Sequence, residues 1–406
     1  MSNLFAVTDL VAKESQRVAH EALQAIATVD RQYDSSFDGS GAPHGATLRV
    51  KKPNQYKRRQ GSRVMDVQDQ SEATQTVTVA TQDGVDMKFN SVELIQSVDN
   101  GEQFDDLSKN YIEPAVCTLI SGIEGDFIAF ATKNTYNLAG TAGTALTDLV
   151  VPGAARAKLN QGLAPKDGQR FIQCDSVAMG GMVNGLKGLF QDSAQIKEQY
   201  REGMMGRTAM ADWYENDRMW TLPNSADVAG EINAGTLTSG ITSLTVDGLT
   251  AAPVEGMVFT IEGTFDVHPE TKAAYPHLKQ FVVGAGSTTT NLVFTPAVIY
   301  DTTNPRQNCS GAPTDNDDIT FVGAASTNYV QQLMYHRDAY QFVTAELPIM
   351  GDANKCSRMT IDGMSFRVWQ GSDIRNGELL MRIDILYGFA ALRPSWGCRM
   401  IGAANA

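Results

Sequence analysis

Tyr335-His336-Arg337-Asp338-Ala339-Tyr340 is the stretch that most narrows the choice of fold. Its His-Arg-Asp centre also occurs in the catalytic loop of protein kinases, where an asparagine follows the aspartate by five residues. Position 343 is Val343, and the chain has neither the glycine-rich loop nor the Asp-Phe-Gly sequence of a kinase. The stretch therefore predicts a structural role, in an ion pair or at a helix start.

Two other stretches accompany it along the chain. The first is Gln199-Tyr200-Arg201-Glu202-Gly203, which continues with Gly206-Arg207 and Asp212-Trp213-Tyr214. The second is Arg382-Ile383-Asp384-Ile385-Leu386-Tyr387-Gly388, which leads to Arg393-Pro394. In order and spacing, the three stretches resemble the coat proteins of short-tailed bacteriophages, a family typified by that of a Salmonella phage.

The resemblance covers residues 46–224 and 324–402, and it implies an α+β protein with the Hong Kong 97-type capsid fold. It also implies a division of the chain into seven parts. These are an N-terminal arm (1–45), an extended loop (46–75), a peripheral domain with a long spine helix (76–140), the first part of an axial domain (141–224), an inserted small β-barrel (225–323), the second part of the axial domain (324–385), and a C-terminal strand and tail of the peripheral domain (386–406).

Residues 225–323 also differ in composition from the rest of the chain. They hold eleven acidic residues and three basic ones, a net −8 of the chain's −13. Short apolar runs alternate there with threonine and glycine, namely Leu244–Val246, Met257–Ile261, Phe281–Val283 and Leu292–Phe294. Short strands at near-regular spacing predict a small β-barrel or sandwich inserted in the main fold.

Apolar spacings of three and four residues predict helices outside this insert. The strongest pattern runs over 103–133, where Pro114 is expected to kink or split the helix. An amphipathic pattern over 5–27 predicts a helical arm, followed by a Gly/Ser-rich linker. A further helix is predicted from Asp192 or Ser193 to Gly203.

Alternating apolar residues predict strands elsewhere. Thr76–Val79 and Val85–Phe89 flank Asp83-Gly84, a pair typical of tight turns, which predicts a β-hairpin. Residues 364–369 and 379–392 are also predicted to form strands.

A basic segment stands out in this acidic chain, because residues 46–64 contain no acidic side chain. With only Tyr56 as an aromatic neighbour, it lacks the stacking residues of a single-strand nucleic-acid site. We therefore favour contact with acidic surface of an adjacent copy over contact with the genome. The candidate inter-subunit residues are Arg49, Lys51, Lys52, Lys57, Arg58, Arg59 and Arg63.

The remaining polar clusters do not assemble into a catalytic or metal site. Asp315, Asp317 and Asp318 lack the glycine and terminal glutamate of a calcium loop, and a solvated turn is the better interpretation. His268 and His277 lie near acidic residues but without the spacing of a zinc site. The five cysteines have no C-x-x-C pair and are expected to be free thiols. We expect a non-enzymatic protein without cofactor or metal.

The net charge of −13 and pI near 4.9 oppose wholesale binding to nucleic acid or to anionic membranes. No apolar run approaches the length of a membrane span. Together with the resemblance, this predicts a major capsid protein of the virion, which self-assembles into hexamers and pentamers around double-stranded DNA without sequence-specific binding.

The resemblance further implies assembly in the bacterial host cytoplasm with a scaffolding protein and with a portal protein at one vertex. It leaves open a decoration protein on the shell. Two alternatives remain at this point. One is an encapsulin-like cellular shell around cargo, and the other is a β-rich binding module that uses residues 225–323 as its reader.

Overall fold

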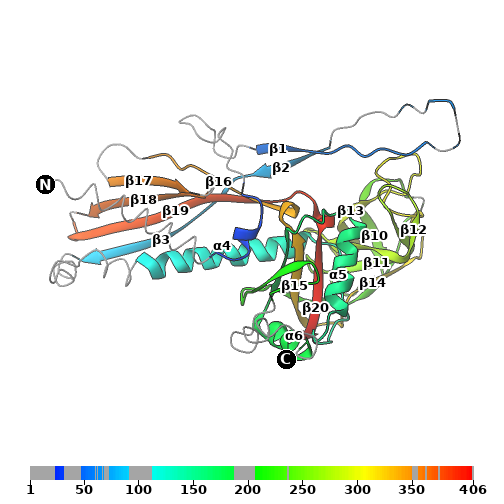
Figure 1. Cartoon of the computed structure of the whole chain (residues 1–406), viewed down its shortest axis with the longest axis horizontal. Helices are drawn as coiled ribbons and strands as arrows, with labels where there is room; N and C mark the ends of the chain where they lie inside the picture. The colour runs from blue at the N-terminus through cyan, green and yellow to red at the C-terminus, as the bar shows by residue number, and fades with distance from the viewer. Residues whose placement is uncertain are drawn as a thin grey trace. The chain divides into compact units, whose positions relative to one another are not determined.

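The computed structural model describes residues 23–31, 47–59, 61, 63–65, 67, 73–90, 112–186, 206–235, 237–349, 355–361, 364–373 and 375–404 (Figure 1). The chain divides into two units, each built from segments that are far apart in sequence. Unit 1 comprises Met1–Val50, Gln75–Phe127 and Tyr340–Ala390. Unit 2 comprises Lys51–Thr74, Ile128–Ala339 and Ala391–Ala406.

A five-stranded sheet forms the framework of unit 1, and its longest strand is β19 (Glu378–Ala391). Three strands pair with β19, which are β3 (Thr81–Asn90), β16 (Tyr340–Ala345) and β18 (Met364–Asp373). β17 (Lys355–Ile361) pairs with β18 in antiparallel register. The strands predicted over 364–369 and 379–392 are confirmed.

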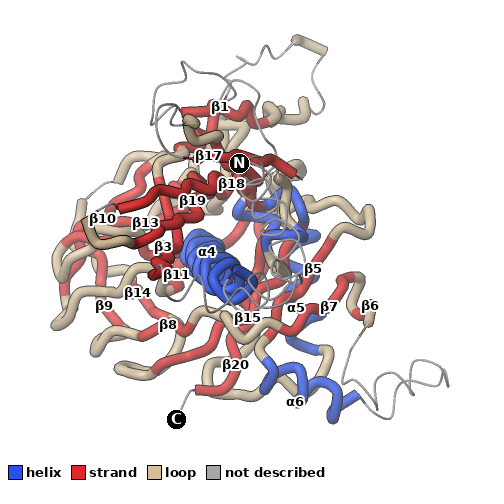
Figure 2. Tube along the Cα trace, turned by 90° about the vertical axis from the view of Figure 1, so that its left-hand side faces the viewer, coloured by secondary structure: helices blue, strands red, loops and turns tan. Residues whose placement is uncertain are grey.

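Helix α4 (Glu113–Asn134) lies beside this sheet and is seen end-on in Figure 2. Apolar residues at three- and four-residue spacings form its buried face, including Val116, Ile120, Ile123 and Phe127. The ring of Phe127 lies 5.6 Å from that of Phe389 on β19. By length and composition alone α4 is apolar enough to cross a membrane, yet half of its most apolar window is buried inside the structure, as in a core helix.

The predicted kink or split of the helix at Pro114 stays a prediction. Pro114 is the second residue of α4 and neither kinks nor splits the helix within its described length. A first-turn position suits proline, because the missing N–H has no intrahelical partner there. Residues 103–111, which the prediction also placed in the helix, lie outside the described residues.

A short segment of the N-terminal arm packs into unit 1. Leu23, Ile26 and Val29 are buried, and the fully buried carboxylate of Glu124 on α4 accepts the backbone N–H groups of Gln24, at 2.8 Å, and of Ala25. Asp30 then pairs with β16, since the N–H of Phe342 donates to its carbonyl at 3.0 Å.

The described end of this arm is not α-helical as predicted, because Ile26–Thr28 forms a single 3₁₀ turn. Residues 5–22 of the predicted arm helix lie outside the described residues, and so does the helix predicted up to Gly203.

The predicted hairpin at Asp83-Gly84 is also wrong. Both residues lie inside β3, where Gly84 pairs with Asp384 and Asp83 pairs with Ile385 of β19. β2 (Ala73–Thr78) pairs instead with β1 (Thr47–Lys52). The Asp-Gly pair is locally suited to a turn, but ten residues of pairing with β19 keep it extended.

Unit 2 contains a seven-stranded sheet in the order β4-β20-β15-β5-β7-β6, with β8 also paired to β15. Its strands are β4 (Leu138–Ala139), β5 (Arg170–Cys174), β6 (Arg207–Thr208), β7 (Ala211–Glu215), β8 (Thr221–Pro223), β15 (Asn328–His336) and β20 (Gly397–Ala404). Two helices accompany it, α5 (Val150–Gln161) and α6 (Ser176–Leu186). A 3₁₀ turn at Arg337–Ala339 follows β15, and another at Pro394–Trp396 precedes β20.

The insert in unit 2 is a closed six-stranded barrel in the order β10-β13-β12-β11-β14-β9. Its strands are β9 (Ala229–Ile232), β10 (Ile241–Asp247), β11 (Val258–Val267), β12 (Ala274–Val283), β13 (Asn291–Val298) and β14 (Asp318–Phe321). Four phenylalanine rings fill its centre with Phe259 in contact with the other three, which are Phe281, Phe294 and Phe321, at 5.5–5.7 Å. The α+β class with a small inserted barrel is confirmed.

Polar side chains join the barrel to the seven-stranded sheet. The amide of Gln280 on β12 exchanges two hydrogen bonds with the backbone of Leu138, at 2.9 and 3.0 Å. The buried guanidinium of Arg399 on β20 donates to the carbonyl of Gly256 at 2.6 Å and to that of Thr135 at 2.7 Å. The division of the chain into seven parts stays a prediction. The structure instead separates two units, and strands β16–β19 lie in unit 1.

Candidate functional site

The seven predicted contact residues lie on one strand and the connection that follows it. Arg49, Lys51 and Lys52 lie in β1. Lys57, Arg58, Arg59 and Arg63 lie between β1 and β2, and all four are exposed. We call the described residues between Pro53 and Val67 the basic loop.

Two of these cations already have partners within their own chain, and one of them is Arg59, whose guanidinium donates to the carbonyl of Val64. The ammonium group of Lys57 donates to the carbonyl of Thr302, in the barrel's β13–β14 connection, at 2.8 Å. The positive charge of Lys57 also contributes to lowering the pKa of Asp301, although the main cause is the hydrogen bonds that this carboxylate accepts from Thr303. The loop thus touches the acidic insert of its own copy, a contact that the sequence analysis did not predict.

The basic loop also carries exposed apolar side chains, which the analysis of its charge did not consider. Val64, Met65 and Val67 are 76%, 77% and 79% exposed, which places three large apolar side chains in water within four residues. The sequence places these residues within four positions of Arg63 but does not by itself show that they are exposed. Clustered exposed apolar side chains mark interaction surfaces more often than singly scattered ones do.

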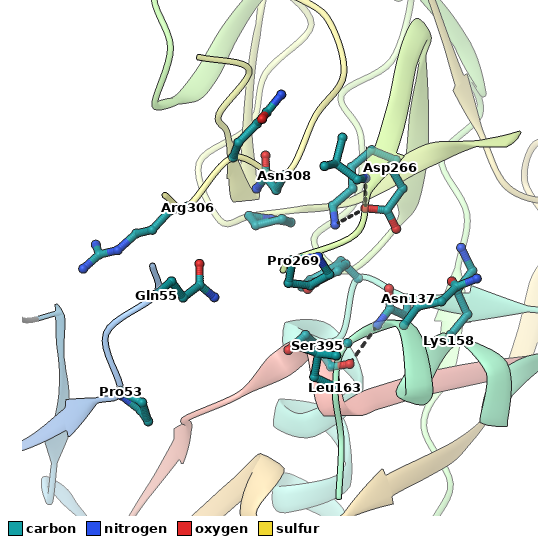
Figure 3. Close-up of a pocket in the computed structure, with 17 residues that line it drawn as sticks. Pro53, Gln55, Asn137, Lys158, Leu163, Asp266, Pro269, Arg306, Asn308 and Ser395 are labelled. Atoms are coloured by element: carbon teal, nitrogen blue, oxygen red, sulfur yellow. Dashed lines mark hydrogen bonds and ion pairs between the residues drawn. The ribbon is translucent and has the colours of Figure 1, made fainter. Parts of the chain in front are cut away.

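A cleft of about 420 Å³ adjoins the root of the basic loop in unit 2. Figure 3 shows Lys158 and Asp266 at one end of it and Pro53, Gln55 and Arg306 at the other. The ammonium group of Lys279 lies 2.8 Å from Asp266 Oδ1 and 5.1 Å from the ring centre of Tyr136. This ion pair is nearly buried and fixes both side chains at the floor of the cleft.

The two histidines singled out by sequence lie on the barrel wall. His277 Nε2 is 3.5 Å from Asp266 Oδ2, and burial together with the positive charge of Lys158 lowers the pKa of His277. His268 Nδ1 accepts the N–H groups of Glu270 and Thr271, so it closes a local turn. No group of three or more metal-binding side chains occurs among the described residues.

The His-Arg-Asp stretch takes the structural role predicted for it. His336 ends β15, is fully buried, and lies 3.1 Å from Asp167 Oδ1, while Arg337 begins the 3₁₀ turn. The pKa of Asp167 is lowered, first by the N–H of Gln169 and then by His336. The acidic residues 315–318 also behave as predicted, in an exposed turn where Thr314 bonds to Asp317.

In unit 1, a groove of about 500 Å³ runs over the sheet formed by β3, β18 and β19. Met87, Trp369, Leu380 and Met381 supply its apolar lining, and Leu380 is 46% exposed. Asp86 and Asp373 add negative charge at the same groove, and Arg382, whose Nε lies 3.9 Å from Asp86 Oδ1, adds a positive charge.

With this geometry in place, the second half of the chain can be compared with known families, and residues 224–402 match a family of bacteriophage coat proteins. The match supports the resemblance to phage coat proteins that the sequence stretches predicted. The matching family is described as the P22 coat protein, gene protein 5. The match spans the barrel and the strands that follow it, including the two later stretches that carried the resemblance.

Solved structures similar to the chain include several phage capsids. A chain of Mycobacterium phage Che8 has 11% identity and a TM-score of 0.47, covering 93% of this chain and 91% of that one. The capsid of cyanophage P-SCSP1u has 10% identity and a TM-score of 0.43, with 92% and 86% covered. The mature capsid of bacteriophage PhiM1 has 10% identity and a TM-score of 0.40, with 91% and 87% covered. The curated proteins contain no match to the chain.

Proposed function

We propose that the chain is a phage coat protein that builds its shell through the basic loop, which packs on an adjacent copy. The single observation that carries the proposal is the exposure of Val64, Met65 and Val67 beside Arg63 on an extended segment. An isolated subunit leaves these apolar side chains in water at a cost of roughly 25 cal/mol per Å². Packing on a neighbouring copy would bury these side chains and remove that cost, which explains why the segment is apolar.

Charge complementarity supports a second copy as the partner. The chain carries −13 overall, and the barrel region alone carries −8. The groove over β3, β18 and β19 offers apolar lining and two carboxylates, Asp86 and Asp373, against the single cation Arg382, and this net negative charge suits a segment that is apolar and basic at once. Each such contact is weak, and a closed shell repeats it many times, so that weak terms sum to a stable particle.

The finer points of the function are part of the same proposal. The shell consists of hexamers and pentamers, encloses double-stranded DNA without sequence-specific contacts, and assembles in the host cytoplasm with a scaffolding protein and a portal protein. A largely acidic coat supports this, because a basic inner wall would bind the genome and oppose its packaging. The protein is structural rather than enzymatic.

The test is a triple reversal of charge, Lys57→Glu with Arg58→Glu and Arg59→Glu. We expect the monomer to keep nearly its full stability, apart from about 0.5–1.5 kcal/mol for each of the hydrogen bonds of Lys57 and Arg59. We expect shell formation to fail, as followed by sedimentation and electron microscopy. The matched control changes the same three residues to glutamine, and its assembly should be intermediate.

A second variant separates charge from apolar contact, by changing Val64, Met65 and Val67 to serine. Normal shells from both variants would refute the proposal. Shells that form from the triple glutamate variant but do not retain DNA would instead place the basic loop against the genome.

A further inference from the structure

The β18–β19 hairpin ends in a turn that carries an Asn-Gly pair, Asn376-Gly377. The two strands pair as far as Asp373 and Glu378, so the Asn-Gly pair lies in the turn between them. Asn376 and Gly377 are both exposed, and Gly377 has a φ of 65°, in the left-handed region that favours glycine. An asparagine side chain, the next backbone nitrogen and water therefore meet in this turn.

These three groups are the reactants of asparagine deamidation. The backbone nitrogen of the glycine loses its proton to water and attacks Cγ of the asparagine side chain. A five-membered succinimide ring forms, while the side-chain nitrogen takes up a proton and leaves as ammonia. Water then opens the ring at either of its carbonyl groups and gives aspartate or isoaspartate, in which the main chain runs through the side-chain carbon. The whole conversion consumes one water and releases one ammonia, without an oxidant or a cofactor.

The glycine and the turn both favour ring closure at this position. Glycine has no Cβ atom, so nothing shields its nitrogen or restricts the backbone rotation that brings the nitrogen to Cγ. A solvated turn also changes its backbone dihedral angles more readily than a helix or a paired strand does. The succinimide of Asn376 and Gly377 can thus form without loss of the strand pairing on either side.

The side-chain nitrogen that leaves is the one that holds the turn. Asn376 Nδ2 donates to Asp373 Oδ2 at 2.8 Å, while the other carboxylate oxygen of Asp373 accepts the N–H of Arg375 at 2.9 Å. Deamidation replaces this donor by a carboxylate. The product loses the hydrogen bond to Asp373 and sets a second negative charge close to it, so the turn is less well held afterwards.

Two other Asn-Gly pairs in the chain allow an internal comparison. Asn184-Gly185 lies in α6, where backbone hydrogen bonds fix the dihedral angles, and Gly185 packs against the carbonyl of Thr147. Ring closure there requires the helix to open. The pair Asn100-Gly101 lies outside the described residues.

We propose that Asn376 is a site of spontaneous covalent modification, which converts to aspartate and isoaspartate through a succinimide with Gly377, whereas Asn184 is protected by its helix. The product adds negative charge beside Asp373, which lines the groove over β3, β18 and β19. An effect on the groove rests on the proposed function, because that function places the basic loop there. The modification does not, because it is measured on the unassembled protein.

The experiment incubates the unassembled full-length protein at mildly acidic and at mildly alkaline pH, and follows each Asn-Gly peptide by mass spectrometry. Digestion in ¹⁸O-labelled water marks any conversion that takes place after unfolding, and a methyltransferase specific for isoaspartate labels that product. We expect the Asn376 peptide to convert at least about tenfold faster than the Asn184 peptide in the folded protein. Its rate should rise with pH, because the attacking nitrogen must lose a proton. In urea the two peptides should convert at similar rates.

Two variants test the chemistry at the turn itself. Asn376→Gln keeps an amide but would have to close a less favourable six-membered ring, so position 376 should stay unmodified. Gly377→Ala should slow the conversion of Asn376 by about tenfold, since a Cβ atom now shields the nitrogen. Conversion of Asn376 no faster than that of Asn184 in the folded protein, or a rate unchanged by Gly377→Ala, would overturn the proposal.

Discussion

Gly84 on β3 lies directly opposite Asp384 on β19, and a Cβ atom at position 84 would come within 2.7 Å of Asp384 Oδ1 and of the carbonyl oxygen of Ile383. The Asp384 carboxylate is fully buried, with Arg367 Nη2 at 2.6 Å and Arg382 Nη2 at 2.7 Å. Glycine at position 84 is thus what lets β3 approach a buried ion cluster in the middle of the sheet.

Gly84→Ala is expected to destabilise the protein by about 1–3 kcal/mol, because the new methyl group meets backbone that does not move aside easily. Thermal or urea unfolding measures the loss. Gly122→Ala is the control, since Gly122 is exposed on α4 with nothing within 4 Å of its Cβ position, and alanine should stabilise that helix by up to about 1 kcal/mol. A Gly84→Ala variant as stable as the unaltered chain would contradict the pairing of Gly84 with Asp384.

The docked segment of the arm changes what an arm deletion should do. The sequence predicts that removal of residues 1–35 leaves a folded monomer, because an isolated helix of that length is marginal in water. The structure argues against this, since Leu23, Ile26 and Val29 are buried in unit 1 and Glu124 accepts two N–H groups of the segment. The deletion leaves that buried carboxylate without these partners.

Glu124→Ala should therefore destabilise unit 1 by about 1–3 kcal/mol for each N–H left without a partner. Glu124→Gln keeps an acceptor oxygen and should cost less. Hydrogen exchange at the amides of Gln24 and Ala25 reads the contact directly, and it should accelerate in the alanine variant. Unchanged hydrogen exchange at these two amides would rule out the contact between Glu124 and the arm segment.

The barrel should fold alone, as its sharp change of composition predicts, but its best boundaries differ from 225–323. Leu222 is buried in the barrel core with Phe259 and Phe281, and Trp220 packs against the same cluster. A fragment of residues 219–323 should therefore melt cooperatively and at a higher temperature than one of residues 225–323. Phe259→Ala should lower the stability of either fragment by about 3–5 kcal/mol, since this ring contacts three others. A fragment without amide dispersion or a cooperative melt would refute the prediction.

The free thiols should differ strongly in reactivity. Burial raises the pKa of Cys309 and of Cys398 to about 12, and it raises that of Cys174 further. A raised pKa lowers the thiolate fraction at any pH below it, and the thiolate is the species that reacts. Cys117 is exposed on α4 and should be alkylated first by iodoacetamide at pH 8, as mass spectrometry of the native monomer can follow. Early labelling of Cys174 would contradict its burial.

Local sequence patterns predicted those strands whose apolar residues and flanking turn residues both favour the observed structure. The runs Met257–Ile261 and Phe281–Val283 are apolar, bounded by turn residues, and lie in barrel strands as expected. The same local logic failed at Asp83-Gly84, because pairing with a strand about three hundred positions later outweighs the turn preference of two residues. α5 and α6 were missed, since their glycines and alanines give a weak apolar period.

In the candidate site as well, local sequence features could be predicted, whereas features that depend on the three-dimensional fold could not. Seven positive residues without an acidic neighbour are visible in the sequence, and the exposure of Val64 and Met65 beside them is not. The cleft was out of reach, because Lys158, Asp266 and Gln55 come from three segments that only the fold brings together.

Closure of the barrel has a consequence for crowding. Strands at the rim of an open sheet present unpaired N–H and C=O groups, and these recruit strands from other molecules. In a six-stranded ring every strand has a neighbour on both sides, so the insert offers no such row. Many copies packed side by side in one shell would turn a single unpaired edge strand into a starting point for aggregation. Because the barrel is closed, this acidic, threonine-rich insert can lie beside other copies and associate with them only through its side chains, not through backbone pairing.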